Sequence, residues 1–157
     1  MDQQFQFMVN GILRTTNEEK PLLRYLRDDL RLYSVKDGCS EGACGTCTIL
    51  VDGKPMRSCI FSTKRAAGKK ILTVEGLSLK EKEAFVYAFG SCGSVQCGFC
   101  IPGMVIATYC LLEENPDPTE EEIRLGISGN ICRCTGYDLI VESIRLASRR
   151  GGDLWKK

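Results

Sequence analysis

The sequence contains no histidine, and this absence removes many kinds of active site. Ser-His-Asp and Cys-His catalysis need an imidazole, as do zinc sites with histidine ligands and Rieske-type clusters. Long apolar runs are also missing, since no stretch approaches the roughly 20 residues that span a bilayer. The net charge is only +1, which gives no field favouring nucleic acid or an anionic membrane.

Against these absences stand ten cysteines among 157 residues. The first residues, MDQQFQFMV, lack the basic and apolar segments of a secretory signal peptide, so we expect a cytoplasmic protein. Disulfide bonds are rare in that compartment. Ten cysteines there indicate metal or redox chemistry, and whatever is bound is bound by thiolates.

The first half of the chain has the pattern of a sheet with one helix. Large apolar residues alternate at Phe5, Phe7 and Val9, which predicts a half-buried strand, and Asn10-Gly11 then predicts a two-residue hairpin. A helix is expected over 22–30, and a second hairpin at Asp52-Gly53. With a further strand over 70–74, these elements describe an α+β domain with a mixed sheet.

The second half has the pattern of helices. They are expected over 79–89, over 100–114, from about 120 after the capping-box pair Thr119 and Glu122, and over 137–150. Four helices in this length suggest a small bundle, with the boundary between the halves in 75–80. The basic stretches STKRAAGKK and SRRGGDLWKK are expected to be a solvated loop and a solvated tail.

One group of cysteines has a specific spacing. Cys39, Cys44 and Cys47 follow the C-x4-C-x2-C pattern of plant-type [2Fe–2S] proteins, and Cys59 supplies a distant fourth ligand. Gly38, Gly42 and Gly45 would let backbone N–H groups point at the sulfur atoms. A four-thiolate zinc site is the alternative, although zinc sites usually consist of two Cys-x2-4-Cys pairs.

The other group is less specific by itself. Cys97 and Cys100 form a Cys-x-x-Cys pair, and Cys132 and Cys134 form a Cys-x-Cys pair, each before an apolar helical segment. A cluster, a zinc ion and a redox dithiol all remain open on these residues alone, and the neighbouring [2Fe–2S] pattern favours a cluster. Two further thiols are expected to be structural: Cys110 as a small buried hydrophobe, and Cys92.

Four segments together resemble one protein family. VKDGCSEGACGTCTILVDGKPMRSC, VQCGFCIPGM, NPDPTEEEI and SGNICRCTGY resemble the small iron–sulfur subunit of the molybdenum hydroxylases, which include xanthine dehydrogenase, aldehyde oxidoreductase and carbon monoxide dehydrogenase. The resemblance implies a β-grasp, plant-ferredoxin-like domain over 1–76 and a four-helix bundle over 77–157. It also implies that the flavin and molybdenum domains are separate subunits of a hetero-oligomer.

The resemblance further assigns roles to residues. It implies that Cys39, Cys44, Cys47 and Cys59 hold an outer [2Fe–2S] cluster, and that Cys97, Cys100, Cys132 and Cys134 hold an inner one. Gln96 and Cys134 would contact the molybdopterin of the large partner subunit. Single electrons would then pass from molybdenum through the inner and outer clusters to FAD on a third subunit, with no substrate chemistry in this chain.

Other functions compete with this interpretation. The resemblance favours a purine or another N-heterocycle as the substrate of the complex, while aldehyde and carbon monoxide enzymes use the same kind of subunit. A succinate dehydrogenase-like subunit would need a C-x2-C-x2-C-x3-C-P run, which the sequence lacks. A zinc-stabilised interaction module without redox function is the remaining alternative.

Overall fold

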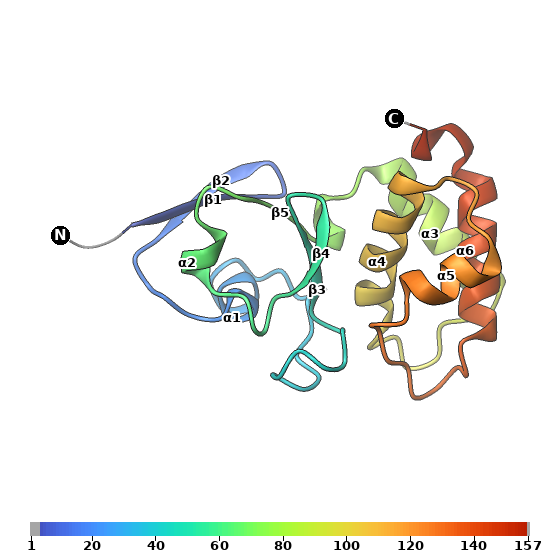
Figure 1. The fold of residues 1–157 in the computed structure, drawn as a ribbon, viewed down its shortest axis with the longest axis horizontal. Coiled ribbons are helices and arrows are strands. Elements are labelled where there is room, and N and C mark those ends of the chain that lie inside the picture. Colours follow the sequence, from blue (N-terminus) through green and yellow to red (C-terminus); the bar gives the residue numbers. More distant parts are fainter. Residues whose placement is uncertain (1–3, 157) are drawn as a thin grey trace.

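A computed structural model describes residues 4–156, with a β-sheet at one end of an elongated molecule and a group of helices at the other (Figure 1). The strands are β1 (Phe5–Val9), β2 (Ile12–Thr16), β3 (Thr48–Val51), β4 (Lys54–Arg57) and β5 (Lys70–Leu72). They lie in the order β2-β1-β5-β3-β4, with β1 and β5 parallel and the other neighbours antiparallel. The predicted mixed sheet, and with it the α+β class, is confirmed.

Two tight turns connect the hairpins of this sheet as predicted. Asn10 and Gly11 have φ angles of 51° and 80°, and Asp52 and Gly53 have φ angles of 50° and 80°. Two consecutive positive φ values match the right-handed twist of the flanking strands, which is why Asn-Gly and Asp-Gly are favoured there. The sequence therefore sets the register of β1 on β2 and of β3 on β4.

Short helices in the first half differ from the prediction. The expected helix over 22–30 is an α-helical turn α1 (Leu22–Arg24) that continues as a π-helix over Tyr25–Asp29. The stretch STKRAAGKK is not simply a solvated loop, because it contains α2 (Thr63–Ala66). Ser62 caps α2 by accepting the Arg65 N–H at 3.2 Å, and Ala66 is fully buried.

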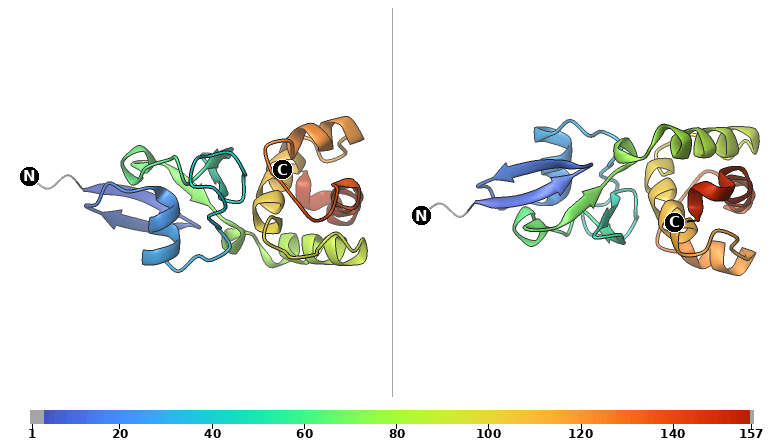
Figure 2. Two further views of the ribbon diagram at one scale, coloured as in Figure 1. Left: turned by 90° about the horizontal axis from the view of Figure 1, so that it is seen from below. Right: turned by 90° about the horizontal axis from the view of Figure 1, so that it is seen from above.

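The second half contains four α-helices among the described residues, as predicted. They are α3 (Leu79–Ser91), α4 (Ile101–Glu114), α5 (Glu120–Gly126) and α6 (Asp138–Gly151), and α4 lies between the sheet and the other three (Figures 1 and 2). The capping box of Thr119 and Glu122 is present at the start of α5. Ser78 and Glu81 form a second capping box at α3, which the sequence analysis did not identify.

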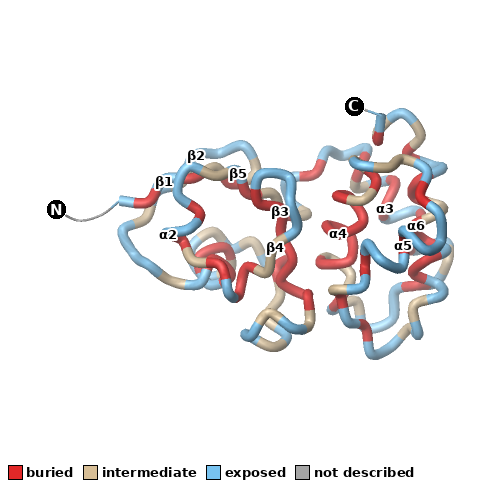
Figure 3. Tube along the Cα trace, in the orientation of Figure 1, coloured by how far each residue is buried: buried red, intermediate tan, exposed pale blue. Residues whose placement is uncertain are grey.

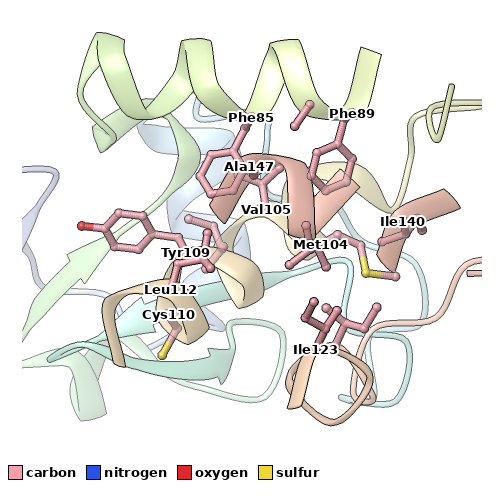
Figure 4. Close-up of a cluster of buried hydrophobic side chains, with 14 of the residues drawn as sticks. Phe85, Phe89, Met104, Val105, Tyr109, Cys110, Leu112, Ile123, Ile140 and Ala147 are labelled. Carbon is pink, nitrogen blue, oxygen red and sulfur yellow. The ribbon is translucent and has the colours of Figure 1, made fainter. Parts of the chain in front are cut away.

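The helices share a hydrophobic core built around α4. Figure 4 shows Phe85 and Phe89 of α3 facing Met104 and Val105 of α4. Trp155 belongs to this core: it is only 1% exposed, and its indole N–H donates to the Ala147 carbonyl at 3.1 Å. The expectation of a solvated tail is therefore wrong for Trp155, because the chain turns back into a 3-10 helix over Gly152–Trp155 after α6.

Strand β3 joins the two halves because both of its faces are covered. Ile49 and Val51 pack in the core beneath α1, whereas Leu50 packs in the helical core. All four residues of β3 are buried as a result, and buried residues line both sides of the junction in Figure 3. Cys110 on α4 is buried at this junction, as predicted, and its thiol donates to the Gly53 carbonyl at 3.5 Å.

Within residues 4–156, none of the helices combines the length and the apolar character that a membrane crossing requires.

Candidate metal centres

The first cysteine site lies in the loop before β3 and at the end of β4. It consists of Cys39, Cys44, Cys47 and Cys59. Cys47 and Cys59 are buried and their thiols are in contact, while Cys39 and Cys44 are half-buried and in contact through the Cys44 N–H, 3.4 Å from the Cys39 Sγ. The fold thus brings together four thiols that are spread over 21 positions of the sequence.

The second cysteine site lies at the starts of α4 and α6. It consists of Cys97, Cys100, Cys132 and Cys134. The Cys97 and Cys134 sulfur atoms are 3.5 Å apart and both residues are exposed, whereas Cys100 and Cys132 are buried and in contact with each other. The two short motifs expected to meet are therefore brought together by the packing of α4 against its neighbours.

Both sites have the donor arrangement that a two-iron cluster requires. Each site consists of two pairs of thiols, and a [2Fe–2S] cluster takes two protein thiolates on each of its two irons. A structural zinc ion would instead need all four donors around one centre. In the described part of the chain, no three His, Cys, Asp or Glu side chains form a group that could hold a metal ion, so the assignment of either site rests on the pairing of its thiols.

Backbone N–H groups lie beside one thiol of each pair at the first site, Cys39 and Cys59. The Cys44 N–H, followed by that of Glu41, lowers the pKa of the Cys39 thiol to about 7. The Gly42 N–H points at Cys59, which is possible because Gly42 has a φ angle of 81°. Such N–H groups stabilise negative charge on a sulfur ligand, as the glycine pattern predicts for Gly42.

One buried thiol at each site has a raised pKa instead. Burial raises the pKa of Cys59 to about 12, with a further contribution from Cys47, and burial likewise raises the pKa of Cys100 to about 12. Cys132 differs: burial opposes its ionisation, yet hydrogen bonds from the Thr135 hydroxyl and from nearby N–H groups lower its pKa overall. A thiol that coordinates a metal is deprotonated, so a bound cluster would replace these protons.

The two sites are joined by direct contacts between their loops. The Ile131 N–H donates to the Cys44 carbonyl at 2.8 Å, which links the residue before Cys132 to a residue of the first site. The buried Asn130 amide donates to the Gly45 carbonyl at 2.9 Å. Gly45 and Gly103 approach so closely that a Cβ on Gly103 would lie 2.6 Å from the Gly45 oxygen.

These contacts were not predicted from the sequence. Asn130 and Ile131 lie within the SGNICRCTGY segment, but their partners are about 85 residues away in the chain. Arg57 makes a comparable contact by donating to the Gly129 carbonyl at 2.5 Å. No spacing rule connects such distant positions, and the only local signal is a polar Asn beside the Cys-x-Cys pair.

The remaining candidate residues lie at the edges of the second site. Gln96 is exposed and precedes Cys97, so it belongs to the same exposed rim as the Cys97–Cys134 pair. Cys92 is half-buried at the C-terminal end of α3, where its N–H bonds to the Ala88 carbonyl at 3.1 Å. Cys92 is thus positioned by the helix end and lies outside both groups of paired thiols.

Comparisons with known protein families give a separate match for each half of the chain. The family described as 2Fe-2S iron-sulfur cluster binding domain matches residues 22–83, and the family described as [2Fe-2S] binding domain matches residues 73–145. The chain is therefore a ferredoxin-like, [2Fe–2S]-binding protein.

Individual relatives define the family more narrowly. The chain is 45% identical to the nicotinate dehydrogenase small FeS subunit of Eubacterium barkeri over 90% of this chain and 92% of that one. It is 46% identical to the xanthine dehydrogenase iron-sulfur-binding subunit of Escherichia coli O157:H7, over 79% of each chain. A chain of quinoline 2-oxidoreductase from Pseudomonas putida 86 superimposes with a TM-score of 0.85 at 42% identity, covering 95% of this chain and 97% of that one.

These matches identify the chain's family. The protein belongs to the small iron–sulfur subunits of the molybdenum hydroxylases, as the resemblance indicated, and it is an electron-transfer component of an oxidoreductase rather than a zinc module.

Proposed function

We propose that this chain holds two [2Fe–2S] clusters and conducts single electrons between partner subunits of a molybdenum hydroxylase. The proposed ligands of the outer cluster are the four thiols of the first site, and those of the inner cluster are the four thiols of the second site. Paired thiols at each site support this assignment, and so does the match of a separate [2Fe–2S] family to each half. Each cluster, when bound, accepts and donates one electron at a time.

The chain's contribution is to hold the two sites at a fixed separation. The observation that carries the proposal is the 2.8 Å hydrogen bond from the Ile131 N–H to the Cys44 carbonyl, because it joins residues at or beside a ligand of each site. Asn130 and Arg57 add hydrogen bonds across the same junction, to the Gly45 and Gly129 carbonyls. No residue of this chain needs to contact the substrate in this function.

The exposed rim of the second site is the proposed contact with the large molybdopterin-binding subunit. Cys97 and Cys134 are exposed there, beside Gln96. Three exposed hydrophobic side chains flank the same cysteines in sequence: Val95, Phe99 and Ile131. A partner that covered this rim would remove apolar surface from water and exclude oxidants from the site, and it would place the pterin beside Gln96 and Cys134.

The organisation of the chain and its complex follows from the same proposal. We expect domains over 1–76 and 77–157, supported by the two separate cores, with the end residues 1–3 and 157 outside the described structure. The second domain would be a four-helix bundle of α3–α6, supported by their shared core. The complex would be a cytoplasmic hetero-oligomer that also contains a FAD subunit.

We propose an N-heterocycle such as a purine as the class of substrate. The relatives described above are named for nicotinate, xanthine and quinoline, which are all N-heterocycles. Aldehyde or carbon monoxide oxidation is the second possibility, because the same kind of subunit serves those enzymes.

The test is to purify the native complex and to add candidate substrates without oxygen. A substrate of the complex should bleach the visible absorbance of the clusters before any artificial electron acceptor is added. N-heterocycles should do so and aldehydes should not. Clusters that stay oxidised when substrate is added without an acceptor, in a complex that does turn the substrate over with one, would contradict the proposed electron path.

A further inference from the structure

The start of α6 differs from the capped starts of α3 and α5. Helices α3 and α5 begin with Ser78 and Thr119, each in extended conformation and each part of a capping box. Helix α6 begins with Tyr137, which has a φ angle of 75° and no side-chain capping bond. A positive φ is unfavourable for a bulky residue, and such strain persists where surrounding contacts enforce it.

The contacts that enforce it connect Tyr137 to Cys132, directly and through Thr135. The Tyr137 side chain turns back so that its Oη accepts the Cys132 N–H at 2.9 Å. The Tyr137 N–H donates to the Thr135 Oγ1 at 3.3 Å, and that hydroxyl donates to the Cys132 Sγ at 3.2 Å. The chain from Cys132 to Tyr137 thus forms a closed ring of hydrogen bonds that begins and ends on one cysteine, with Gly136 at a φ angle of 71° allowing the bend.

The direction of the Thr135 hydrogen follows from simple counting. A hydroxyl has one hydrogen and accepts bonds through its oxygen, and the oxygen of Thr135 already accepts the Tyr137 N–H. A cysteine that binds a metal is a thiolate and has no hydrogen to give. The hydrogen in the Thr135–Cys132 contact must therefore come from Thr135.

The first site offers a related contact with a different outcome. Thr46 Oγ1 lies 3.2 Å from the Cys44 Sγ, but this hydroxyl also lies 3.1 Å from the Lys36 carbonyl, to which it donates. Its one hydrogen is shared between an oxygen and a sulfur acceptor. Thr135 has no such competing acceptor among the contacts of the described residues, so its bond to sulfur is the stronger of the two.

We propose that Thr135 and Tyr137 are positioning residues for the inner cluster: Tyr137 fixes the direction of the Cys132 ligand, and the Thr135 hydroxyl raises the cluster's reduction potential. A hydrogen bond to a ligand sulfur stabilises the reduced cluster more than the oxidised one, because the reduced cluster carries one more negative charge. This inference rests on the proposed function, since it requires a cluster at the second site.

The experiment is an EPR-monitored redox titration of the intact complex carrying Thr135→Val, Thr135→Ser, Tyr137→Phe or Thr46→Val. Thr135→Val should lower the potential of the inner cluster by about 59 mV, which corresponds to a tenfold shift in a one-electron equilibrium. The outer cluster should not change. Thr135→Ser keeps the hydroxyl and should stay close to the wild-type potential.

The other two variants separate positioning from tuning. Tyr137→Phe keeps the ring but removes the acceptor of the Cys132 N–H, so it should alter the shape of the inner EPR signal and leave the outer signal intact. Thr46→Val should shift the outer potential by less than Thr135→Val shifts the inner one. Loss of the inner cluster from Thr135→Val but not from Thr135→Ser would also support the role of the hydroxyl.

Several results would overturn the inference. In Thr135→Val, they are an unchanged potential of the inner cluster or an equal shift in the potentials of both clusters. In Thr135→Ser, the contradicting result is a shift as large as that in Thr135→Val. In Tyr137→Phe, it is an unaltered EPR signal of the inner cluster. An absence of any inner signal in the wild-type complex would instead overturn the proposed function itself, so the two failures are distinguishable.

Discussion

The two cysteine sites use the same pairing of thiols but differ in how they meet the solvent. At the first site both members of the less buried pair, Cys39 and Cys44, are half-buried, whereas at the second site Cys97 and Cys134 are exposed. The other pair is buried at both sites. The first site is therefore more enclosed within this chain than the second, and the exposed pair of the second site lies where the proposed partner subunit would cover it.

The largest effect should come from removing one ligand at each site. Cys59→Ser should abolish the outer cluster and leave the inner EPR signal, and Cys134→Ser should do the reverse. Iron should fall from about four to about two atoms per chain in either variant, because each cluster contains two irons. If either substitution removed both signals equally, the two sites would not be independent.

Local sequence patterns predicted many of the turns and helix starts in the fold that carries these sites. The hairpins at Asn10-Gly11 and Asp52-Gly53 follow from residues that adopt positive φ, and the start of α5 follows from Thr119 and Glu122. These signals involve neighbours in the chain, so one sequence suffices to find them. The grouping of thiols into two sets was likewise visible in their spacing.

Contacts between distant segments could not be predicted in this way. Asn130 bonds to Gly45, and Trp155 is buried in the helical core although its surroundings in the sequence are basic and glycine-rich. The strained conformation of Tyr137 also gave no signal, because it is enforced by a bond to Cys132 rather than by its own preference. The contacts, burial and conformation of such residues are set by tertiary packing and not by local propensity.

A smaller effect should follow from disturbing the junction between the sites. Gly103→Ala places a Cβ 2.6 Å from the Gly45 oxygen, so the loop of the first site must move. We expect a loss of about 1–3 kcal/mol in the free energy of unfolding, as for other overpacked positions, and slower electron transfer between the clusters. Thermal unfolding without oxygen and the rate of outer-cluster reduction after inner-cluster reduction measure these two effects.

Gly90→Ala on α3 is the matched control for this substitution. A Cβ at Gly90 meets no atom within 4 Å, so replacing glycine in a helix should stabilise the protein by roughly 0.5–1 kcal/mol. The electron-transfer rate should not change. A similar loss of stability in both variants would show that the close approach of Gly103 to Gly45 is not responsible.

The smallest structural effect should come from Gln96→Ala on the exposed rim. Gln96 is exposed and lies beside Cys97, so both clusters should assemble with unchanged EPR signals. Electron entry from the molybdenum subunit should be slower, and rapid-mixing reduction of the clusters by substrate measures this rate. Gln4, which is exposed at the other end of the molecule, serves as the control position, where alanine should have no effect. An unchanged rate in Gln96→Ala would refute the pterin contact.

The proposed electron path depends most directly on the presence of two clusters in one chain. The decisive measurement combines iron and acid-labile sulfide analysis with EPR spectroscopy of the dithionite-reduced native protein. The proposed function predicts about four irons and about four sulfides per chain, with two distinguishable [2Fe–2S] signals. A colourless protein with stoichiometric zinc, or about two irons with a single signal, would contradict it.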